Sequence, residues 1–361
     1  IQKNKISISL DQAATIIMLT QTLYKHFPIF KGNQKHIITY LPILVLMPHS
    51  ACNCRCIMCD IWKDNKHLKQ LEMEDIRHLL ETFKKLNTRL VLMSGGEAIL
   101  NPNFFRFCEL LRSHDIKVSL LSTGLTLQKH ADAIINWVND VIVSLDGNEN
   151  VHDTIRNMPG AYRKLKEAVQ QIKSLKQDFP ISSRTVIHKY NFHHWPEIIE
   201  SAMEIGLDRV SFLPADVSSQ AFNRATPWDE QRQMKILPDI TELAELKSII
   251  NSIIIKYAEY FESGYFAESP EKLMRIHAYY EACHGLRAYP YKKCNAPWVS
   301  AVVEADGTVR PCFFHQPIGN IKENDLDEIL NGETGLSFRK SLDMGNNATC
   351  QQCVCYLHHK K

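Results

Sequence analysis

The sequence predicts an α/β protein whose parallel strands are covered by helices, followed by a smaller cysteine-rich unit. The first observation is an alternation, along residues 41–213, of short apolar runs with longer segments in which apolar residues recur at helical spacing. This alternation is typical of a barrel, a partial barrel or an open sheet built from parallel strands. The second observation is the eleven cysteines, an odd number gathered in two groups. Clustering of this kind favours a metal or cofactor site over a disulfide framework.

Bulk composition is that of an ordinary globular protein, and it narrows the choice of partners. The chain has 361 residues, of which 45% are hydrophobic and 23% are charged, and its formal net charge is +2. At roughly 150 residues per domain, this length allows one large domain with an appendage or two medium ones. A charge so close to zero creates no general attraction for nucleic acid or an anionic membrane, so we expect neither as a partner. No apolar run approaches the roughly 20 residues of a spanning helix, and no secretory leader pattern is present, so we expect a cytoplasmic protein.

Six short apolar runs predict buried strands, and the segments between them predict helices. The strands are expected at Ile43–Met47, Leu90–Met93, Val118–Leu121, Val141–Leu145, Thr185–Ile187 and Val210–Leu213. The helices are expected at Glu74–Leu86, Pro102–Ser113, Lys129–Val138, Tyr162–Lys176 and Trp195–Gly206. In such folds the chemistry takes place at the carboxyl ends of the strands, so we look for functional residues there.

The rest of the chain has a different organisation. Residues 10–27 predict a single amphipathic helix that covers the sheet. The polar stretch 214–240 is either a substrate loop or a plain connector, and 241–261 is expected to be helical. From residue 294 onward, Asp306-Gly307 between two apolar runs predicts a β-hairpin, followed by short helices. We therefore divide the chain into 1–40, an N-terminal helical segment, 41–240, the α/β domain, 241–293, a helical connection, and 294–361, the cysteine-rich unit.

The first cysteine group has a specific spacing. Cys52, Cys56 and Cys59 form C-x3-C-x2-C directly after the first predicted strand. Three thiolates on one short loop can hold an iron-sulfur cubane and leave one iron open to a small molecule. A zinc site would need a fourth ligand, for which His49 is the nearest candidate. Cys54 falls outside the spacing and is interpreted as a bystander.

A Gly-Gly-Glu motif, Gly95, Gly96 and Glu97, follows the second predicted strand. Two glycines let a ligand approach the backbone, and the carboxylate can accept hydrogen bonds from an ammonium group. Taken alone, the motif also fits a tight turn with a solvated glutamate. Its position one strand after the cysteine loop favours a shared site.

Together these motifs resemble those of the radical S-adenosylmethionine enzymes, and the resemblance covers roughly residues 41–213. It implies a partial (β/α)6 barrel, similar to a TIM barrel, in which Cys52, Cys56 and Cys59 ligate a [4Fe-4S] cluster. The open iron of that cluster would bind S-adenosylmethionine, with the Gly-Gly-Glu motif facing the methionine amino group. One-electron reduction would then cleave the cofactor to a 5′-deoxyadenosyl radical, which abstracts hydrogen from a substrate.

The resemblance implies further cofactor contacts and contains two departures. Ser122 and Ser144 end the third and fourth predicted strands and are candidate contacts. Arg156 is expected to pair with the methionine carboxylate, with a surface ion pair as the alternative. Met58 stands where an aromatic residue usually precedes the last cysteine and is still expected to pack on adenine. Ala98 replaces the proline that usually follows Gly-Gly-Glu.

The second cysteine group has four members at Cys294-x17-Cys312 and Cys350-x2-Cys353. Four thiolates make a closed site, and on chemistry alone a zinc knuckle is a serious alternative. After a barrel of the kind described, the pattern resembles the SPASM auxiliary-cluster domain in its shortened twitch form. The resemblance implies one auxiliary [4Fe-4S] cluster held by these four cysteines. Two further cysteines remain open as ligands, Cys283 and Cys355.

A fully ligated second cluster has no open iron for a substrate, so electron transfer is its expected role. We therefore expect an oxidoreductase that carries out a dehydrogenation or related C–H functionalisation, supplied with electrons by a flavodoxin or ferredoxin. The substrate is expected to be a small sugar, cyclitol or other metabolite, because the roughly forty residues before the first strand are fewer than a leader-recognition domain needs. The alternative is a maturase of ribosomal peptides. An alternative of another class is a non-catalytic iron-sulfur or zinc protein, and no catalytic acid or base is assigned.

Overall fold

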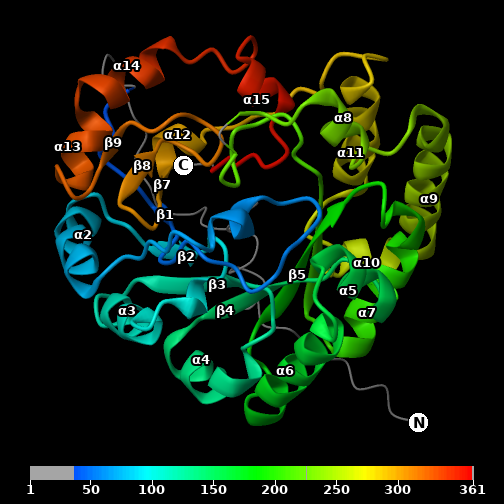
Figure 1. Ribbon diagram of the computed structural model, residues 1–361, viewed down its shortest axis with the longest axis horizontal. Helices are drawn as coiled ribbons and strands as arrows, with labels where there is room; N and C mark the ends of the chain where they lie inside the picture. Colours follow the sequence, from blue (N-terminus) through cyan, green and yellow to red (C-terminus); the bar gives the residue numbers. More distant parts are fainter. Residues whose placement is uncertain (1–35, 225, 360–361) are drawn as a thin grey trace.

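The computed structural model describes residues 36–224 and 226–359, and these form a curved sheet of nine strands with helices around it (Figure 1). The order of strands is β6-β5-β4-β3-β2-β1-β7-β8-β9. The amphipathic helix expected over residues 10–27 lies outside the described residues. No helix in the described part of the chain is long and apolar enough to cross a lipid bilayer.

The six predicted strands are present, and each of β1 to β6 pairs in parallel with the next. β5 begins four residues before the expected start because Ser182 and Ser183, although polar, are fully or nearly fully buried in the sheet. The predicted partial barrel is thereby confirmed. The bounds of the six strands are β1 Ile43–Leu46, β2 Leu90–Met93, β3 Lys117–Ser122, β4 Asp140–Ser144, β5 Ile181–Ile187 and β6 Arg209–Pro214.

Helices α2 to α7 connect these strands and cover the outer face of the sheet (Figure 1). On α2 the buried positions Ile76, Leu79 and Phe83 recur at helical spacing and belong to the main hydrophobic core. The short helix α5 was not expected, because its sequence is mostly polar. The bounds are α2 Met73–Lys85, α3 Phe104–Arg112, α4 Ala131–Trp137, α5 Glu149–Arg156, α6 Ala161–Leu175 and α7 Trp195–Ile205. Single 3-10 turns occur at η1 Ile61–Asp64, η2 Ala98–Leu100, η3 Gln128–His130, η4 Phe192–His194 and η5 Ile240–Glu242.

The segment after β6 adds a helical layer on one side of the barrel. The helix expected over 241–261 is broken at Tyr257, which ends one helix and begins the next. After it, Phe266 forms a parallel bridge with Val210 of β6 and so extends the barrel wall. The bounds are α8 Glu230–Met234, α9 Leu243–Lys256, α10 Ala258–Glu262 and α11 Pro270–Cys283.

The C-terminal unit continues the same sheet rather than forming a separate one. β7 pairs in parallel with β1, with Ile43 opposite Ser300 and Leu46 opposite Val303. β7 and β8 then form the expected antiparallel hairpin, and β9 pairs with β8. The bounds are α12 Ala296–Val299, β7 Ser300–Val303, β8 Thr308–Arg310, β9 Gly319–Asn320, α13 Leu326–Asn331, α14 Glu333–Ser341 and α15 Ala348–Gln352.

Candidate functional site

The first cysteine loop lies at the carboxyl edge of the barrel and is anchored at both ends. Asn65 holds the start of the loop, because its side-chain oxygen accepts from Cys52 N at 3.0 Å and its amide donates to Cys52 O at 2.8 Å. At the other end, Trp62 Nε1 donates to Cys59 O at 2.9 Å. These contacts fix the backbone of the loop independently of any bound cluster.

The three thiols of this loop have different surroundings. Cys56 is buried, whereas Cys52 and Cys59 are half-buried. A hydrogen bond from the Cys54 thiol, together with the charge of Arg156, lowers the pKa of Cys56. Burial raises the pKa of Cys52 and of Cys59 to about 12. Since iron binds thiolates, the lowered pKa favours Cys56 as a ligand. The interpretation of Cys54 as a bystander stays a prediction.

Gly96 lies directly beneath the cysteine loop. A Cβ atom at this position would stand 2.2 Å from Ala51 O and 3.0 Å from the Cys52 Cβ, so no other residue fits. Gly95 has φ +110°, a conformation that favours glycine. The next residue, Glu97, donates its backbone N–H to Ala51 O at 2.9 Å. The Gly-Gly-Glu turn and the cysteine loop are therefore packed backbone against backbone.

Glu97 is fully buried and is held by the end of β3. Its Oε2 accepts hydrogen bonds from Thr123 N at 2.8 Å, Thr123 Oγ1 at 2.6 Å and Ser122 Oγ at 3.1 Å. Burial raises the pKa of Glu97. Its other oxygen, Oε1, has no partner among the described residues, which leaves a buried acceptor for a ligand donor.

Arg156 ends α5 and reaches back to the cysteine loop. Its guanidinium lies 2.5 Å from the Asp146 carboxylate and 3.5 Å from the Cys56 sulfur, and all three residues are buried. Two backbone carbonyls at the end of the helix, those of Arg156 and Ile155, accept from the loop N–H groups of Arg55 and Ile57. The structure thus pairs Arg156 with a carboxylate and a cysteine of the protein, and contact with the methionine carboxylate stays a prediction.

The remaining candidate contacts lie near the same edge. Met58 is half-buried and packs against the main hydrophobic core. Ser144 is half-buried at the last position of β4, opposite Arg184 of β5. Contact of Met58 or Ser144 with the cofactor stays a prediction.

The segment after β6 covers the cysteine loop. Trp228 Nε1 donates to the Asp60 carboxylate at 2.6 Å, and an Arg232 guanidinium nitrogen donates to Ile57 O at 2.7 Å. Arg224 lies 3.8 Å from the centroid of a Trp228 ring and forms a buried ion pair with Asp216 at 2.7 Å. The sequence marked this stretch, with Asp216, Arg224 and Trp228, as a substrate loop or a connector. It did not predict these contacts, because the partners of Trp228 and Arg232 are distant in the chain.

The second cysteine group collects thiols from separate segments. Burial, with smaller contributions from the Cys294 and Cys350 thiols, raises the pKa of Cys312 to about 12. Burial, followed by the Cys355 and Cys312 thiols, raises the pKa of Cys353. These mutual effects mean that the four cysteines expected as ligands lie near one another, and their binding of a cluster stays a prediction.

Two side chains support this second group. Lys292 Nζ donates to Gln351 O at 2.9 Å and also to Cys353 O, which fixes the backbone between the last two cysteines. A His315 ring nitrogen lies 3.3 Å from the Cys350 sulfur. Cys355 is exposed and lies near Cys353 and Cys294, whereas Cys283 lies beside Tyr289, so the choice of ligands beyond the four stays open.

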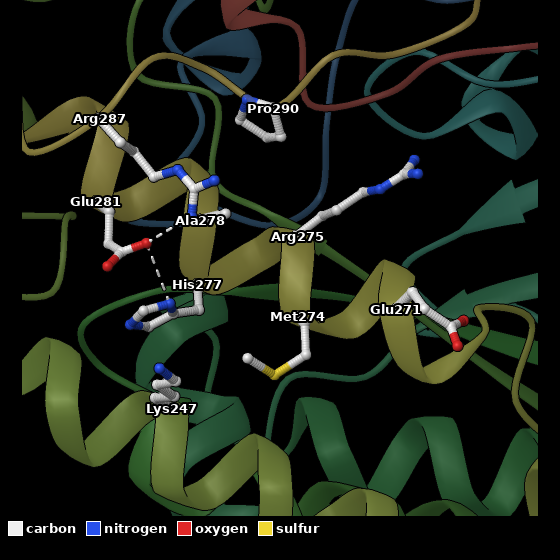
Figure 2. Close-up of a pocket in the computed structure, with 9 residues that line it drawn as sticks. All are labelled: Lys247, Glu271, Met274, Arg275, His277, Ala278, Glu281, Arg287 and Pro290. Atoms are coloured by element: carbon white, nitrogen blue, oxygen red, sulfur yellow. Dashed lines mark hydrogen bonds and ion pairs between the residues drawn. The ribbon is translucent and has the colours of Figure 1, made fainter.

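A surface pocket of about 310 Å³ lies along α11, with Lys247 of α9 also lining it (Figure 2). Glu281 lies 3.4 Å from His277, one turn earlier on the same helix, and 3.0 Å from Arg287. None of the residues that line it is a candidate site residue. The pocket is therefore separate from the chemistry suggested by the cysteines.

The donor sets fit iron-sulfur clusters. All eleven cysteines lie in the described residues and are free thiols. In the described ranges, no three His, Cys, Asp or Glu side chains are gathered closely enough to hold a single metal ion. A cubane holds its ligands around a larger core than one ion does, and three or four cysteines are its usual donor set. Gly96 also lets the Gly-Gly-Glu turn pack against the cysteine loop, and Glu97 Oε1 is a buried acceptor that an amino-acid ligand could use.

The partial barrel carries a three-cysteine loop at its carboxyl edge, and a second cysteine set follows in the unit that extends the same sheet. Together these features define an iron-sulfur protein. The radical SAM superfamily matches residues 46–202, and the SPASM iron-sulfur cluster-binding domain matches residues 294–354. The chain therefore contains a radical SAM domain followed by a SPASM domain. Its cofactors are accordingly S-adenosylmethionine, the [4Fe-4S] cluster that binds it, and an auxiliary iron-sulfur cluster.

Several known proteins are similar along most of the chain. An AdoMet-dependent heme synthase of Methanosarcina barkeri is 23% identical over 85% of this chain and 86% of that protein. The sporulation killing factor maturation protein SkfB of Bacillus subtilis is 22% identical over 81% of this chain, which spans 65% of that protein. The crystal structure of Streptococcus suis SuiB bound to precursor peptide SuiA has a TM-score of 0.63 at 13% identity, covering 89% of this chain and 72% of that chain.

Proposed function

We propose that the chain is a radical S-adenosylmethionine oxidoreductase that functionalises a C–H bond of a peptide substrate. The observation that carries the enzyme class is the packing of the Gly-Gly-Glu turn against the three-cysteine loop. A Cβ atom at Gly96 would stand only 2.2 Å from Ala51 O, so the turn leaves no room for a side chain there. The relative SkfB is named for the maturation of a peptide factor, and the fold is shared with SuiB, whose structure contains a precursor peptide. These likenesses favour a peptide over the small molecule expected from the short N-terminal segment.

When bound, the clusters supply one-electron cleavage of S-adenosylmethionine to a carbon radical and a second redox centre. The protein supplies the geometry. Cys52, Cys56 and Cys59 would hold the first cluster, and Glu97 Oε1 would accept a hydrogen bond from the methionine amino group. The Trp228 segment, bonded to Asp60, covers the loop and excludes water. Four thiolates from Cys294 onward close the second site to substrate, which favours electron transfer there, and a flavodoxin or ferredoxin supplies the first electron.

A small-molecule substrate is the second candidate function. The heme synthase of Methanosarcina barkeri supports it, because the similarity spans 86% of that protein. The two candidates share the same cofactor chemistry and differ in what enters the barrel.

The enzyme class is tested with anaerobically reconstituted protein, dithionite and S-adenosylmethionine. We expect 5′-deoxyadenosine, detected by mass spectrometry, from the parent protein and none from Cys56→Ala. Cys108→Ala is the matched control, since Cys108 is buried in the core on α3, away from both cysteine groups. Absence of the product from a parent protein that holds both clusters would contradict the proposal.

The substrate class is tested with an extract of expressing cells grown in deuterated medium. The extract is separated into a small-metabolite fraction and a peptide fraction, and each is supplied to the enzyme. We expect deuterium in 5′-deoxyadenosine from the peptide fraction, and we expect prior protease treatment to remove that signal. Deuterium transfer from the metabolite fraction alone would replace the peptide proposal with the second candidate.

A further inference from the structure

Charged side chains occupy the inner face of β5 and β6, opposite the hydrophobic core. Side chains alternate between the two faces of a strand. On β6, Val210 and Phe212 lie in the main core beneath the helices. Arg209 and Ser211 therefore face the barrel interior. The same alternation places Arg184 of β5 on the inner face, because Ile181 and Ile187 belong to the core.

The strand register makes these inner residues neighbours. Arg184 lies opposite Ser211 on one side and Ser144 on the other, and Arg209 lies opposite Ser182. Arg184 and Arg209 are thus diagonal neighbours on adjacent strands, about 7–8 Å apart at their Cα atoms. At this separation the two long side chains can reach the same carboxylate group. Ser144 ends β4 at the edge where the cysteine loop lies, so this row reaches from the candidate cofactor site into the barrel.

Both arginines lack a partner in the described part of the chain. Neither guanidinium makes a hydrogen bond or an ion pair there, and Nε is a buried donor without an acceptor in both. Arg209 is only 9% exposed, and its burial lowers its pKa. Burying an arginine without an acceptor is costly, and native proteins avoid it unless a ligand or function requires it.

One carboxylate lies near the two arginines and is already engaged. Glu268 accepts hydrogen bonds from Ser211 Oγ and Phe212 N, both at 2.9 Å. Burial raises the pKa of Glu268, and the charges of Arg184 and Lys272 oppose this shift. The charge of Glu268 in turn opposes the lowering of the Arg209 pKa by burial. Three cationic side chains therefore surround one carboxylate, and none of them is within ion-pair distance of it.

The other acidic group on this face does not restore the balance. Asp140 of β4 is hydrogen-bonded to Ser119 Oγ at 2.7 Å, and burial raises its pKa to about 7. The C-terminal tail reaches the amino end of the barrel, where Leu357 packs on Ile43 and Leu90. Arg184, Arg209 and Lys272 therefore outnumber the two carboxylates of Glu268 and Asp140.

We propose that Arg184 and Arg209 bind a carboxylate group of the substrate inside the barrel. Guanidinium groups bind carboxylates through paired, charge-assisted hydrogen bonds, and the vacant donors of both arginines provide them. The identification of the ligand as substrate rests on the proposed function, whereas the binding of a carboxylate does not. The carboxylate belongs either to an acidic side chain of a peptide or to a free metabolite.

Binding is measured by isothermal titration on the reconstituted full chain without reductant, so that no turnover takes place. The probes are glutarate, the blocked peptide acetyl-Gly-Glu-Gly-amide and its Gly-Gln-Gly analogue. We expect Arg184→Gln and Arg209→Gln each to weaken carboxylate binding by about tenfold or more. Arg112→Gln, which changes an exposed arginine on the outer helix α3, is the matched control and should bind like the parent.

The arms of the experiment separate the sources of the carboxylate. Tighter binding of the Glu peptide than of both the Gln peptide and glutarate supports a peptide side chain, and preference for glutarate supports a metabolite. Equal binding by the parent and both inner variants, or no carboxylate binding by the parent, overturns the proposal. Arg184→Lys, which keeps the charge, should bind between the parent and the glutamine variant, and circular dichroism shows whether each variant folds. A parent that binds glutarate but makes no 5′-deoxyadenosine would contradict the proposed function and leave the carboxylate site standing.

Discussion

The two cysteine sites differ in how the chain assembles them. The first takes its three expected ligands from one loop of eight residues, which is contacted by distant segments, among them Arg156 and Trp228. The second collects its expected ligands from three separate segments that follow the barrel, in a unit whose strand β7 pairs with β1. A site with local ligands can be recognised by spacing alone, whereas a site with dispersed ligands requires the fold to be complete.

The largest expected difference is between Cys56→Ala and Cys312→Ala. The first change should abolish 5′-deoxyadenosine formation, because it removes a ligand of the cluster that binds S-adenosylmethionine. The second change should lower the iron content by the amount held in the auxiliary cluster, while cleavage of S-adenosylmethionine continues. Iron analysis and mass spectrometry of the product check both. Loss of cleavage in Cys312→Ala would show that the two sites do not assemble independently.

Arg156→Gln should destabilise the first site more than any change at an exposed pair. It leaves the Asp146 carboxylate buried without its cation, at a cost of about 3–5 kcal/mol in the free energy of unfolding. Urea denaturation measures the cost. Asp146→Asn combined with Arg156→Gln should recover part of the loss, because the uncompensated charge is then absent, and no recovery would show that the pair is not the cause.

The barrel should also show a pH dependence that comes from Asp140. Burial raises its pKa from 3.8 to about 7 in the folded chain, so the folded state binds the proton more tightly than the unfolded state. This contribution is complete below pH 3.8 and is lost as the pH rises to about 7, a change of about 4 kcal/mol. Asp140→Asn should flatten the urea stability profile in this window. An unchanged profile would contradict the assignment.

Substitutions at two glycines, one in each cysteine-containing region, test how tightly the two regions are packed. Gly96→Ala brings a Cβ against the backbone of the cysteine loop, and we expect a loss of about 1–3 kcal/mol together with poorer iron loading of the first cluster. Gly307→Ala meets the Asn320 side chain, which can move, and its cost of about 1–2 kcal/mol comes from φ +89°. Thermal denaturation and iron analysis distinguish them. Equal loss of the first cluster in both variants would contradict the comparison.

The smallest effect is expected at the exposed ion pair that joins the two regions. Lys69 lies 3.1 Å from the Asp306 carboxylate, with side chains 50% and 36% exposed. Lys69→Ala should cost about 0.2–1 kcal/mol, and salt should remove the difference. A larger cost would show that this pair, rather than the strand pairing, holds the C-terminal unit on the barrel.

The sequence predicted the strands well, because their signals are local. Apolar runs marked the buried strands, and the spacing of Cys52, Cys56 and Cys59 indicated that they share one loop. The sequence was less informative where long-range contacts decide the structure. Helix α11 lies within the predicted helical connection 241–293, but its limits were not predicted, because it combines charged and aromatic residues without a clear apolar stripe and is stabilised by packing against α9 and β6.

The sequence also did not predict which side chains surround individual site residues. Arg156 was expected to pair with the methionine carboxylate or in a surface ion pair, and the sequence did not predict that the fold brings the buried Asp146, just after β4, against it. The inner position of Arg184 follows from strand alternation, and its lack of a partner among the described residues depends on which side chains the partial barrel brings nearby. The C-terminal unit was predicted as a hairpin with short helices, and its parallel pairing with β1 had no local signal.

That pairing has a consequence for synthesis of the chain. β1 is made early, but its partner β7, at residues 300–303, leaves the ribosome only after some 250 more residues. At about 5–20 residues per second, this takes on the order of tens of seconds. During that time the Ile-Leu-Val-Leu edge of β1 presents unpaired backbone groups to other nascent chains. Premature termination before residue 300 therefore leaves a barrel whose first strand is an open, apolar edge prone to aggregation.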